Sequence, residues 1–370
     1  MISSCDVGSL PLRVEESLIN KGARKSITLL PFIGVPDEET KTFEREIVNS
    51  FADKLRNGID IPNYTQFRDM NEMFFELIQG IEKVGAEYVA FRNPKVKPNT
   101  SIPEVNVVKR NISEIRDLAN VEYVRLKACV TGPYTLSSFF STKSPGLFED
   151  LGSTLTEIFS RSFFETKYSR LDLLCIDEPV LGFLDDPLLD YGSEGRESLR
   201  RAWEEMCRVA ALKNVETCMH LHDTSDDLFW EVEHLHVVES HVEDPLYTLE
   251  KTKGRLEDTD KCLKASIYVT LFDKLIEEKI MAQGKSQDLQ QRLGEIWTEI
   301  RHRQIDPLTF LEDPALVAKR LEKVVRRFGP ERVPYAGPEC GLSSWPTYES
   351  SMECLKRISA TVEDYNKKKH

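Results

Sequence analysis

The sequence predicts an α/β fold, a single (β/α)8 TIM barrel that occupies residues 1–370 as one domain. Three observations support this class. Eight short apolar runs alternate with helical patterns along the 370 residues, which is the order of elements in a parallel sheet covered by helices. No repeat or long Gly/Ser/Pro linker divides the chain. Polar or reactive motifs follow all but one of the apolar runs, as expected at the carboxyl ends of barrel strands. A doubly wound open sheet is the second interpretation.

The predicted strands are apolar runs bounded by turn residues. In chain order they are Ser3–Leu10, Ile59–Pro62, Tyr123–Val130, Leu171–Ile176, Val215–Leu221, Leu235–Val242, Cys262–Val269 and Arg332–Ala336. The predicted helices repeat apolar residues at helical spacing. They are Glu39–Arg56, Asn71–Gly80, Phe148–Tyr168, Glu197–Lys213, Asp226–Glu233, Leu289–Arg301, Pro314–Phe328 and Thr347–Tyr365. The polar, Pro-containing segment Asn99–Asn111 predicts a small insertion between the second helix and the third strand.

The composition indicates a globular protein with an acidic surface. A formal net charge of −13, with no basic patch, argues against a nucleic-acid partner. No apolar run approaches the roughly 18 residues of a membrane span, and the N-terminus lacks the pattern of a secretory signal. The eight cysteines form no CxxC pair, which is typical of a reducing compartment. We therefore expect a cytoplasmic protein that binds neither nucleic acid nor membrane.

Histidines concentrate in one part of the chain, since five of the seven lie between residues 220 and 241. His220 and His222, two apart at the end of a predicted strand, project from one face of it. Glu239 lies near the end of the next predicted strand, and Cys340 follows the last one. Imidazole, carboxylate and thiolate are the ligands that zinc takes. The pattern therefore predicts a metal site of His220, His222, Glu239 and Cys340. His241, just past Glu239, is expected to orient that carboxylate or to contact substrate.

A simpler interpretation is that the histidines only satisfy polar groups at strand ends. His234 and His236 fit it, because they lie at the start of a predicted strand, remote from the site end of a barrel. For His220 and His222 we prefer the metal, because two imidazoles at this spacing are accompanied by a strand-end Glu and a strand-end Cys.

Two further motifs follow predicted strands. Asp177 and Glu178 come directly after an apolar run. An Asp can cap a helix there, but an unpaired buried charge is costly, so Asp177 predicts a cationic partner on the substrate or an Arg. Gly8 and Ser9, in the first strand-to-helix turn, offer backbone N–H groups and a hydroxyl to a carboxylate or phosphate.

The strand-end motifs together resemble the C-terminal catalytic barrel of the cobalamin-independent methionine synthase family. They occur in the family's order over nearly the whole chain, as Val7-Gly8-Ser9-Leu10-Pro11, Thr131-Gly132-Pro133, Ile176-Asp177-Glu178-Pro179 and Glu339-Cys340-Gly341-Leu342. The resemblance implies that Gly8 and Ser9 contact an amino-acid substrate and that Asp177 holds the ammonium of homocysteine. It also implies that His220, Glu239 and Cys340 bind catalytic zinc.

The chain departs from that family at three places. His222 stands where the family has a cysteine, which replaces a thiolate by a neutral imidazole and removes one negative charge from the site. Gln66 stands where an acidic contact to the substrate ammonium is expected. Residues 267–272 contain no histidine, whereas the family uses one there to protonate its folate leaving group.

The leading hypothesis is a zinc-dependent methyltransferase that moves a methyl group to a thiol, homocysteine by preference, to give methionine. The missing histidine, and the absence of the family's amino-terminal barrel, argue against a folate donor. The resemblance extends to short, single-barrel relatives that take the methyl group from a methylcorrinoid, which implies methylcobalamin or a corrinoid protein as the donor. Its cob(I)amide leaving group needs no proton, which would account for the missing histidine. Glu239 is the ligand expected to yield to the incoming thiol, and Asp177 and Ser9 are expected to hold the substrate's ammonium and carboxylate.

Two alternatives stay open. One is a thiol alkyltransferase that acts on coenzyme M or another thiol, which the loss of the acidic contact at Gln66 favours and the presence of Asp177 opposes. The other is a non-catalytic relative whose metal site has decayed, for which His222 is the main support.

Overall fold

The computed structural model describes residues 1–27, 36–183, 185–282, 284 and 288–368. The strands are β1 Ser3–Ser4, β2 Ile78–Val84, β3 Glu87–Val96, β4 Val124–Thr131, β5 Ser169–Glu178, β6 Glu216–Leu221, β7 Val237–Glu239, β8 Cys262–Tyr268 and β9 Tyr335–Pro338. The helices are α1 Glu16–Lys25, α2 Glu38–Arg56, α3 Glu72–Phe75, α4 Pro103–Arg110, α5 Ile112–Ala119, α6 Pro133–Ser137, α7 Pro145–Ser162, α8 Glu194–Leu212, α9 Pro245–Thr248, α10 Glu250–Thr259, α11 Phe272–Ala282, α12 Leu289–Arg301, α13 Pro314–Phe328 and α14 Tyr348–Lys367. Short 3-10 helices cover Pro187–Leu189, Leu228–Glu231, Pro307–Phe310 and Pro330–Arg332.

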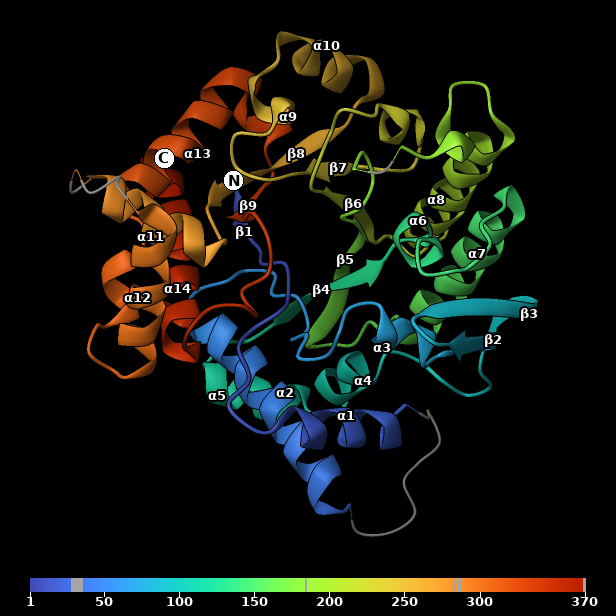
Figure 1. Cartoon of the computed structure of the whole chain (residues 1–370), viewed down its shortest axis with the longest axis horizontal. Helices are drawn as coiled ribbons and strands as arrows, with labels where there is room; N and C mark the ends of the chain where they lie inside the picture. The colour runs from blue at the N-terminus through green and yellow to red at the C-terminus, as the bar shows by residue number, and fades with distance from the viewer. Residues whose placement is uncertain (28–35, 184, 283, 285–287, 369–370) are drawn as a thin grey trace.

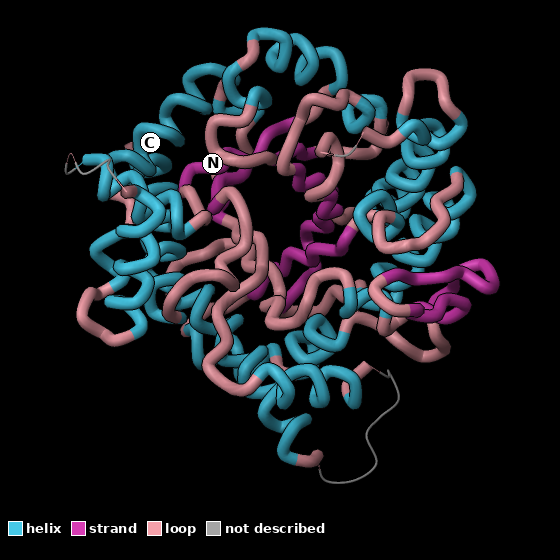
Figure 2. Tube along the Cα trace, in the orientation of Figure 1, coloured by secondary structure: helices cyan, strands magenta, loops and turns pink. Residues whose placement is uncertain are grey.

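Seven strands form one parallel sheet in the order β1-β9-β8-β7-β6-β5-β4. The last strand pairs with the first, so the sheet curls into a wall around a central axis, as Figure 2 shows. The helices lie outside this wall (Figure 1). Two hydrogen bonds between the backbone of Ile2 and the side chain of Asn366 at the end of α14, of 3.0 and 2.8 Å, join the two ends of the chain. The predicted α/β class with a curled parallel sheet is confirmed.

The gap in the wall between β1 and β4 is filled by an irregular segment. The predicted strand Ile59–Pro62 is not a regular strand, and a full eight-stranded count is not reached. Ile61 instead donates its N–H to Ser4 (3.0 Å), and Lys127 donates to Pro62 (2.9 Å). Tyr64 N–H donates to Lys127 O at 3.2 Å. The next amide of β4 is then satisfied by a side chain, because Cys129 N–H donates to Asn63 Oδ1 at 2.9 Å.

Two predictions in the next segment need correction. Of the predicted helix Asn71–Gly80, only α3 is helical, because Gly80 has φ +88° and Gly85 has φ +65°. These conformations favour a bulged β-hairpin, and β2 and β3 pair antiparallel. An insertion is present between the predicted second helix and the third strand, as expected. It is the β2–β3 hairpin, however, and not the stretch Asn99–Asn111. The polar stretch Asn99–Asn111 is mostly helix α4.

Other element predictions differ at shorter range. The predicted helix Asp226–Glu233 is a single 3-10 turn, Leu228–Glu231, that begins where the Asp226 carboxylate accepts Leu228 N–H at 2.7 Å. The first predicted strand, Ser3–Leu10, is regular only over β1, after which it makes isolated bridges. The last strand extends beyond the predicted Arg332–Ala336 to Pro338. Among the described helices, none is both long and apolar enough to cross a membrane.

Candidate metal centre

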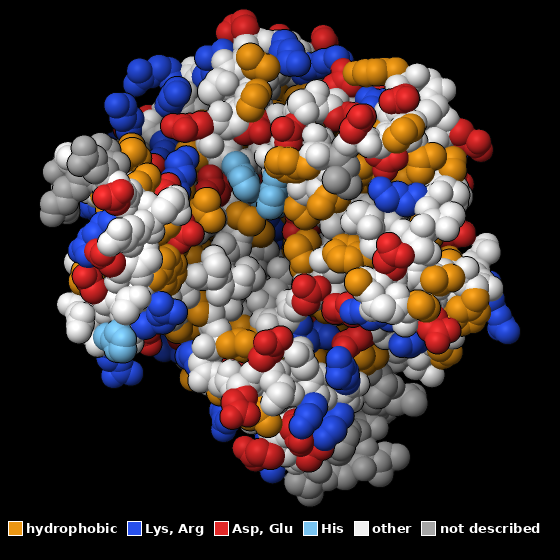
Figure 3. Space-filling model, viewed as in Figure 1, with side chains coloured by type: hydrophobic (Ala, Val, Ile, Leu, Met, Phe, Trp, Pro, Cys, Tyr) orange, Lys and Arg blue, Asp and Glu red, His pale blue; other side chains and the backbone are white. Residues whose placement is uncertain are grey.

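The strands bring the predicted site residues to one end of the sheet. His220 is the last residue but one of β6, and Asp177 holds the same position in β5. Glu239 ends β7, and Cys340 lies two residues after β9. Because the strands are parallel, their carboxyl ends meet at one edge, which is where barrel enzymes hold their sites. Figure 3 shows histidine side chains beside the central hollow of one face of the molecule.

Four side chains come together as a group of potential metal ligands. They are His220, His222, His241 and Cys340, and one nitrogen or sulfur of each lies within 4.8 Å of the others. Cys340 Sγ is 3.6 Å from His222 Nε2, and the rings of His222 and His241 have centroids 4.2 Å apart. Zinc bonds of about 2.0–2.3 Å place tetrahedral ligands about 3.3–3.8 Å apart. The group therefore needs to contract only slightly to hold such an ion.

Unpartnered buried atoms support a cation at this position. Nε2 of His220 and Nε2 of His241 are buried without a hydrogen-bond partner among the described residues. Buried polar atoms are nearly always paired, so these nitrogens fit a ligand-binding role. Burial alone would raise the pKa of the Cys340 thiol, but the three imidazoles hold it well below its ordinary value. Burial also lowers the pKa of His222, which favours the neutral, ligand-competent ring.

Glu239 lies next to this group but has other partners. Lys127 Nζ is 3.1 Å from its Oε1, and Lys264 pairs with its Oε2. All three side chains are almost fully buried. Glu239 Oε1 also lies 3.4 Å from His220 Nδ1. Burial alone would raise the pKa of Glu239, but the two lysines hold it well below its ordinary value. The structure thus places His241, rather than Glu239, among the four clustered side chains that could hold a metal ion.

The predicted substrate contacts Gly8, Ser9 and Gln66 lie together. Ser9 and Gln66 form a β-bridge, and Gln66 N–H donates to Gly8 O at 3.3 Å. Gly8 has φ +134°, and a Cβ there would lie 2.1 Å from the Asn63 amide nitrogen. A Cβ on Gly341 would lie 2.0 Å from Ser9 Oγ, so the Ser9 hydroxyl sits against the chain that carries Cys340. The predicted substrate contacts and the potential metal ligands therefore adjoin.

The two strand-end carboxylates of β5 have separate roles. Asp177 Oδ1 is buried without a partner among the described residues, and burial raises the pKa of Asp177 to about 8. Glu178, by contrast, accepts hydrogen bonds from the backbone of Tyr134 and Thr135 and from Trp203 Nε1. Glu178 is thus committed to the start of α6, whereas Asp177 is available to a ligand.

His234 and His236 lie apart from the group. His234 pairs with Glu204, and His236 Nδ1 lies 3.0 Å from Thr217 Oγ1. Both precede β7, at the opposite end of that strand.

Three residues that bear on the site were not predicted. Lys127 and Lys264 lie inside β4 and β8, where a lysine gives no sign of which way it points. The sequence shows Glu339 beside Cys340, but it does not indicate that the Glu339 side chain is buried.

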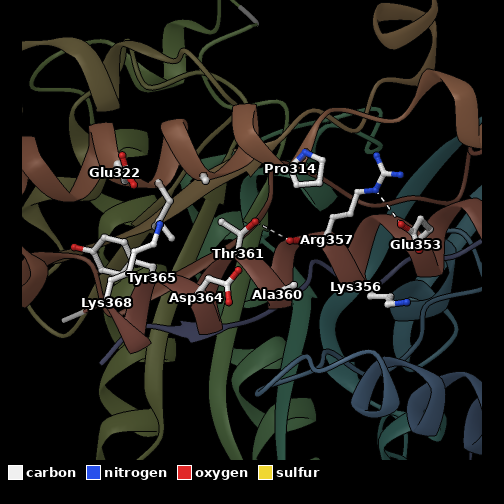
Figure 4. Close-up of a pocket in the computed structure, with 12 residues that line it drawn as sticks. Pro314, Glu322, Glu353, Lys356, Arg357, Ala360, Thr361, Asp364, Tyr365 and Lys368 are labelled. Atoms are coloured by element: carbon white, nitrogen blue, oxygen red, sulfur yellow. Dashed lines mark hydrogen bonds and ion pairs between the residues drawn. The ribbon is translucent and has the colours of Figure 1, made fainter. Parts of the chain in front are cut away.

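The outer surface also carries a pocket of about 220 Å³ between α13 and α14 (Figure 4). Pro314 and Glu322 line it from one helix, and Arg357 and Thr361 from the other. None of the predicted site residues lines this pocket, so it is separate from the metal centre.

Comparisons with known proteins show which fold this is. No protein-family model matches the chain, and no curated protein matches it significantly. The chain is similar to the structure of a B12-independent methionine synthase from Shewanella sp. W3-18-1 in complex with selenomethionine, with a TM-score of 0.59 and 16% identity over 100% of this chain and 98% of that one. It is also similar to a methyltransferase from Methanosarcina mazei, with a TM-score of 0.50 and 15% identity over 99% and 94%. At the level of the fold, the resemblance to the methionine synthase barrel is confirmed.

Proposed function

We propose that the protein is a zinc-dependent methyltransferase that moves a methyl group to a thiol. The observation that carries the proposal is the group of three imidazoles and one thiol at the strand ends of a methionine synthase fold. The unpartnered buried nitrogens of His220 and His241 fit a cation there.

His220, His222 and Cys340 are proposed zinc ligands, as the sequence suggested. For the remaining position the geometry favours His241 over Glu239, because the Glu239 carboxylate already pairs with Lys127 and Lys264. Glu239 faces His220 Nδ1, and a carboxylate in that place fixes the tautomer that leaves Nε2 for a metal. Coordination by Glu239 is the alternative, and it requires the two lysines to release the carboxylate.

When bound, zinc supplies a Lewis acid that keeps a substrate thiol deprotonated at neutral pH. Three neutral imidazoles and one thiolate leave such a centre with one net positive charge. That charge favours deprotonation of the thiol and lowers the nucleophilicity of the resulting thiolate. The thiolate sulfur would attack the methyl carbon, and the bond from that carbon to the donor would break with its electron pair remaining on the donor.

The remaining side chains define the place of the substrate. Asp177 is proposed to bind the ammonium of homocysteine, because its buried Oδ1 has no other partner among the described residues. Gly8 and Ser9 are proposed to bind the carboxylate end, since the Ser9 hydroxyl lies against Gly341 in the chain that carries Cys340. Gln66, which forms a β-bridge with Ser9, lies beside them. The similar Shewanella structure is a complex with selenomethionine, the selenium analogue of the methionine that homocysteine would yield.

A methylcorrinoid, free as methylcobalamin or on a corrinoid protein, is the proposed donor. Residues 267–272 carry no histidine or carboxylate, so this stretch offers no acid for a leaving group that needs a proton. A cob(I)amide leaving group needs none.

The second candidate is a thiol alkyltransferase that acts on coenzyme M or another thiol. Gln66 favours it, because its neutral amide bonds Tyr64 (3.2 Å) and gives no charge to an ammonium.

The test is a spectrophotometric assay of zinc-loaded protein with methylcobalamin, with homocysteine and coenzyme M compared as acceptors. Loss of the methylcobalamin spectrum with homocysteine supports the proposal, and turnover with coenzyme M alone supports the second candidate. No reaction with either, while zinc stays bound, contradicts a free corrinoid donor. Protein that binds no zinc, and in which His220→Ala changes nothing measurable, contradicts the metal centre itself. Cys340→Ser is the inactive control, and His302→Ala, on the exposed end of α12, is the matched surface control.

A further inference from the structure

We propose that Glu339 is a positioning residue of the metal centre, whose carboxylate sets His241 against Cys340. The proposal rests on the metal centre proposed above. Glu339 directly precedes Cys340 at the end of β9, and only 6% of its surface is exposed.

The Glu339 carboxylate joins three strand ends. Its Oε2 accepts the backbone N–H of Val242, the residue after His241, at 2.8 Å. Its Oε1 accepts the backbone N–H of Thr270, after β8, at 2.9 Å. Its own N–H donates to Tyr268 O at 3.0 Å. One side chain therefore fixes the loop that carries His241 relative to the chain that carries Cys340.

The loop after β7 needs this support. Glu243 has φ +71°, a conformation that is uncommon for residues other than glycine and is held only by its surroundings. Asp244 N–H closes the turn onto His241 O at 3.1 Å. Without the Glu339 acceptor, the Val242 N–H would lose its bond and the position of the His241 ring would be less restricted.

The Glu339 carboxylate also forms no ion pair with a lysine, arginine or histidine among the described residues. By contrast, Glu243 has Lys274 at 4.0 Å and Glu312 has Arg320 at 2.7 Å. A buried carboxylate that is held only by backbone N–H groups is stabilised by a nearby positive charge. A metal ion bound by Cys340 and His241 would supply that charge.

Glu312 provides a matched control. It is also buried, at 5% exposed, and its Oε2 accepts the N–H of Val269, one residue before Thr270. It supports the loop after β8 but, among the described residues, forms no hydrogen bond or ion pair with the loop of His241 or with Cys340. Glu312→Gln thus reproduces the loss of a buried loop-supporting carboxylate without the proposed positioning effect.

The experiment measures Co²⁺ binding to the full chain by competition with a chelator and by the cobalt–thiolate absorption band. Glu339→Gln turns one of the two acceptor positions into an N–H donor. We expect it to retain the cobalt–thiolate band, since Cys340 is intact, but to bind Co²⁺ about 10- to 100-fold more weakly. Glu312→Gln is expected to match wild type. Glu339→Asp keeps both acceptor oxygens on a shorter side chain, so its Co²⁺ affinity is expected to lie between those of wild type and Glu339→Gln. This variant replaces Glu339→Gln in the test if Glu339→Gln does not fold.

A double-mutant cycle identifies the route of the effect. If Glu339 acts through His241, then adding Glu339→Gln to His241→Ala weakens Co²⁺ binding by no more than about two- to threefold. The proposal is overturned if Glu339→Gln weakens Co²⁺ binding as much in the His241→Ala background as in wild type. It is also overturned if Glu339→Gln and Glu312→Gln lose equal Co²⁺ affinity. Neither outcome contradicts the proposed metal centre. Wild-type protein that binds no Co²⁺ overturns the proposed function together with it.

Discussion

At the scale of single residues, Asp177 makes the stability of the protein depend on pH. Burial raises its pKa from the ordinary 3.8 to about 8. Between these two values the folded protein holds a proton that the unfolded chain has released, so the free energy of unfolding falls as pH rises. The fall is at most about 1.4 kcal/mol per pH unit. Asp177→Asn removes this contribution, so the variant is expected to gain stability relative to wild type between pH 5 and pH 8.

The measurement is urea unfolding of the metal-free protein at several pH values in that range. Asp117→Asn, on the exposed face of α5, is the control and should track wild type throughout. A constant difference between Asp177→Asn and wild type at pH 5 and pH 8 would show that the Asp177 carboxyl is ionised in the folded state already at pH 5. A bound ammonium would produce that ionisation, so the same titration with homocysteine tests its predicted partner.

The sequence predicted reactive residues where they directly follow a predicted strand. It did not predict the side chains that pair with them. His220, His222 and Cys340 could be found because reactive groups follow apolar runs at the end that barrels use. The sequence could not predict that His241, rather than Glu239, joins the clustered group. The reason is that Lys127 and Lys264 pair with the Glu239 carboxylate. These lysines lie on strands remote in the sequence and turn inward, where each needs an anion.

At the scale of elements, Glu178 holds a short helix in place. α6 has only five residues, too few to be stable alone, and its first two N–H groups donate to the Glu178 carboxylate at 3.0 and 2.7 Å. Trp203 Nε1 on α8 donates to the same carboxylate at 2.8 Å. Gly132 allows this approach, since a Cβ there would lie 2.2 Å from the carboxyl carbon.

Glu178→Gln is expected to lower the free energy of unfolding by about 1–3 kcal/mol, because its amide nitrogen faces donors and leaves buried N–H groups unsatisfied. Urea unfolding checks the value. Glu197→Gln on the exposed side of α8, where the Glu197 side chain bonds Arg200, is expected to change it by less than about 0.5 kcal/mol. Equal effects of the two substitutions would contradict a capping role for Glu178.

Strand predictions were correct where the apolar pattern was long. They failed where side chains make the hydrogen bonds that backbone groups make in a regular strand. The strands around Leu171–Ile176 and Cys262–Val269 were correctly predicted because most residues in these runs are apolar, which is typical of strands buried on both faces. The segment at Ile59–Pro62 lies in the wall as expected, but Asn63 makes a contact that a regular strand would make through its backbone. The hairpin of β2 and β3 was missed because its strands are largely exposed and do not alternate regularly.

At the scale of the whole molecule, the metal centre links parts of the barrel that are far apart in sequence. Its proposed ligands come from β6, from the loop after β7 and from the chain after β9. The unfolded chain cannot bring these groups together, so an ion that binds them stabilises the folded state. At a free zinc concentration 100-fold above the dissociation constant, the stabilisation is about 2.7 kcal/mol.

Thermal or urea unfolding with zinc, and with a chelator in its place, measures this difference. Cys340→Ser and His222→Ala are expected to reduce or abolish it, whereas His302→Ala should retain it in full. Burial would lower the pKa of His220, but Asp177, Cys340 and Glu239 raise it well above its ordinary value, so zinc must displace a proton from that ring and the stabilisation should shrink as the pH falls. A zinc effect that survives in Cys340→Ser, or that is independent of pH, would place the ion elsewhere on the protein.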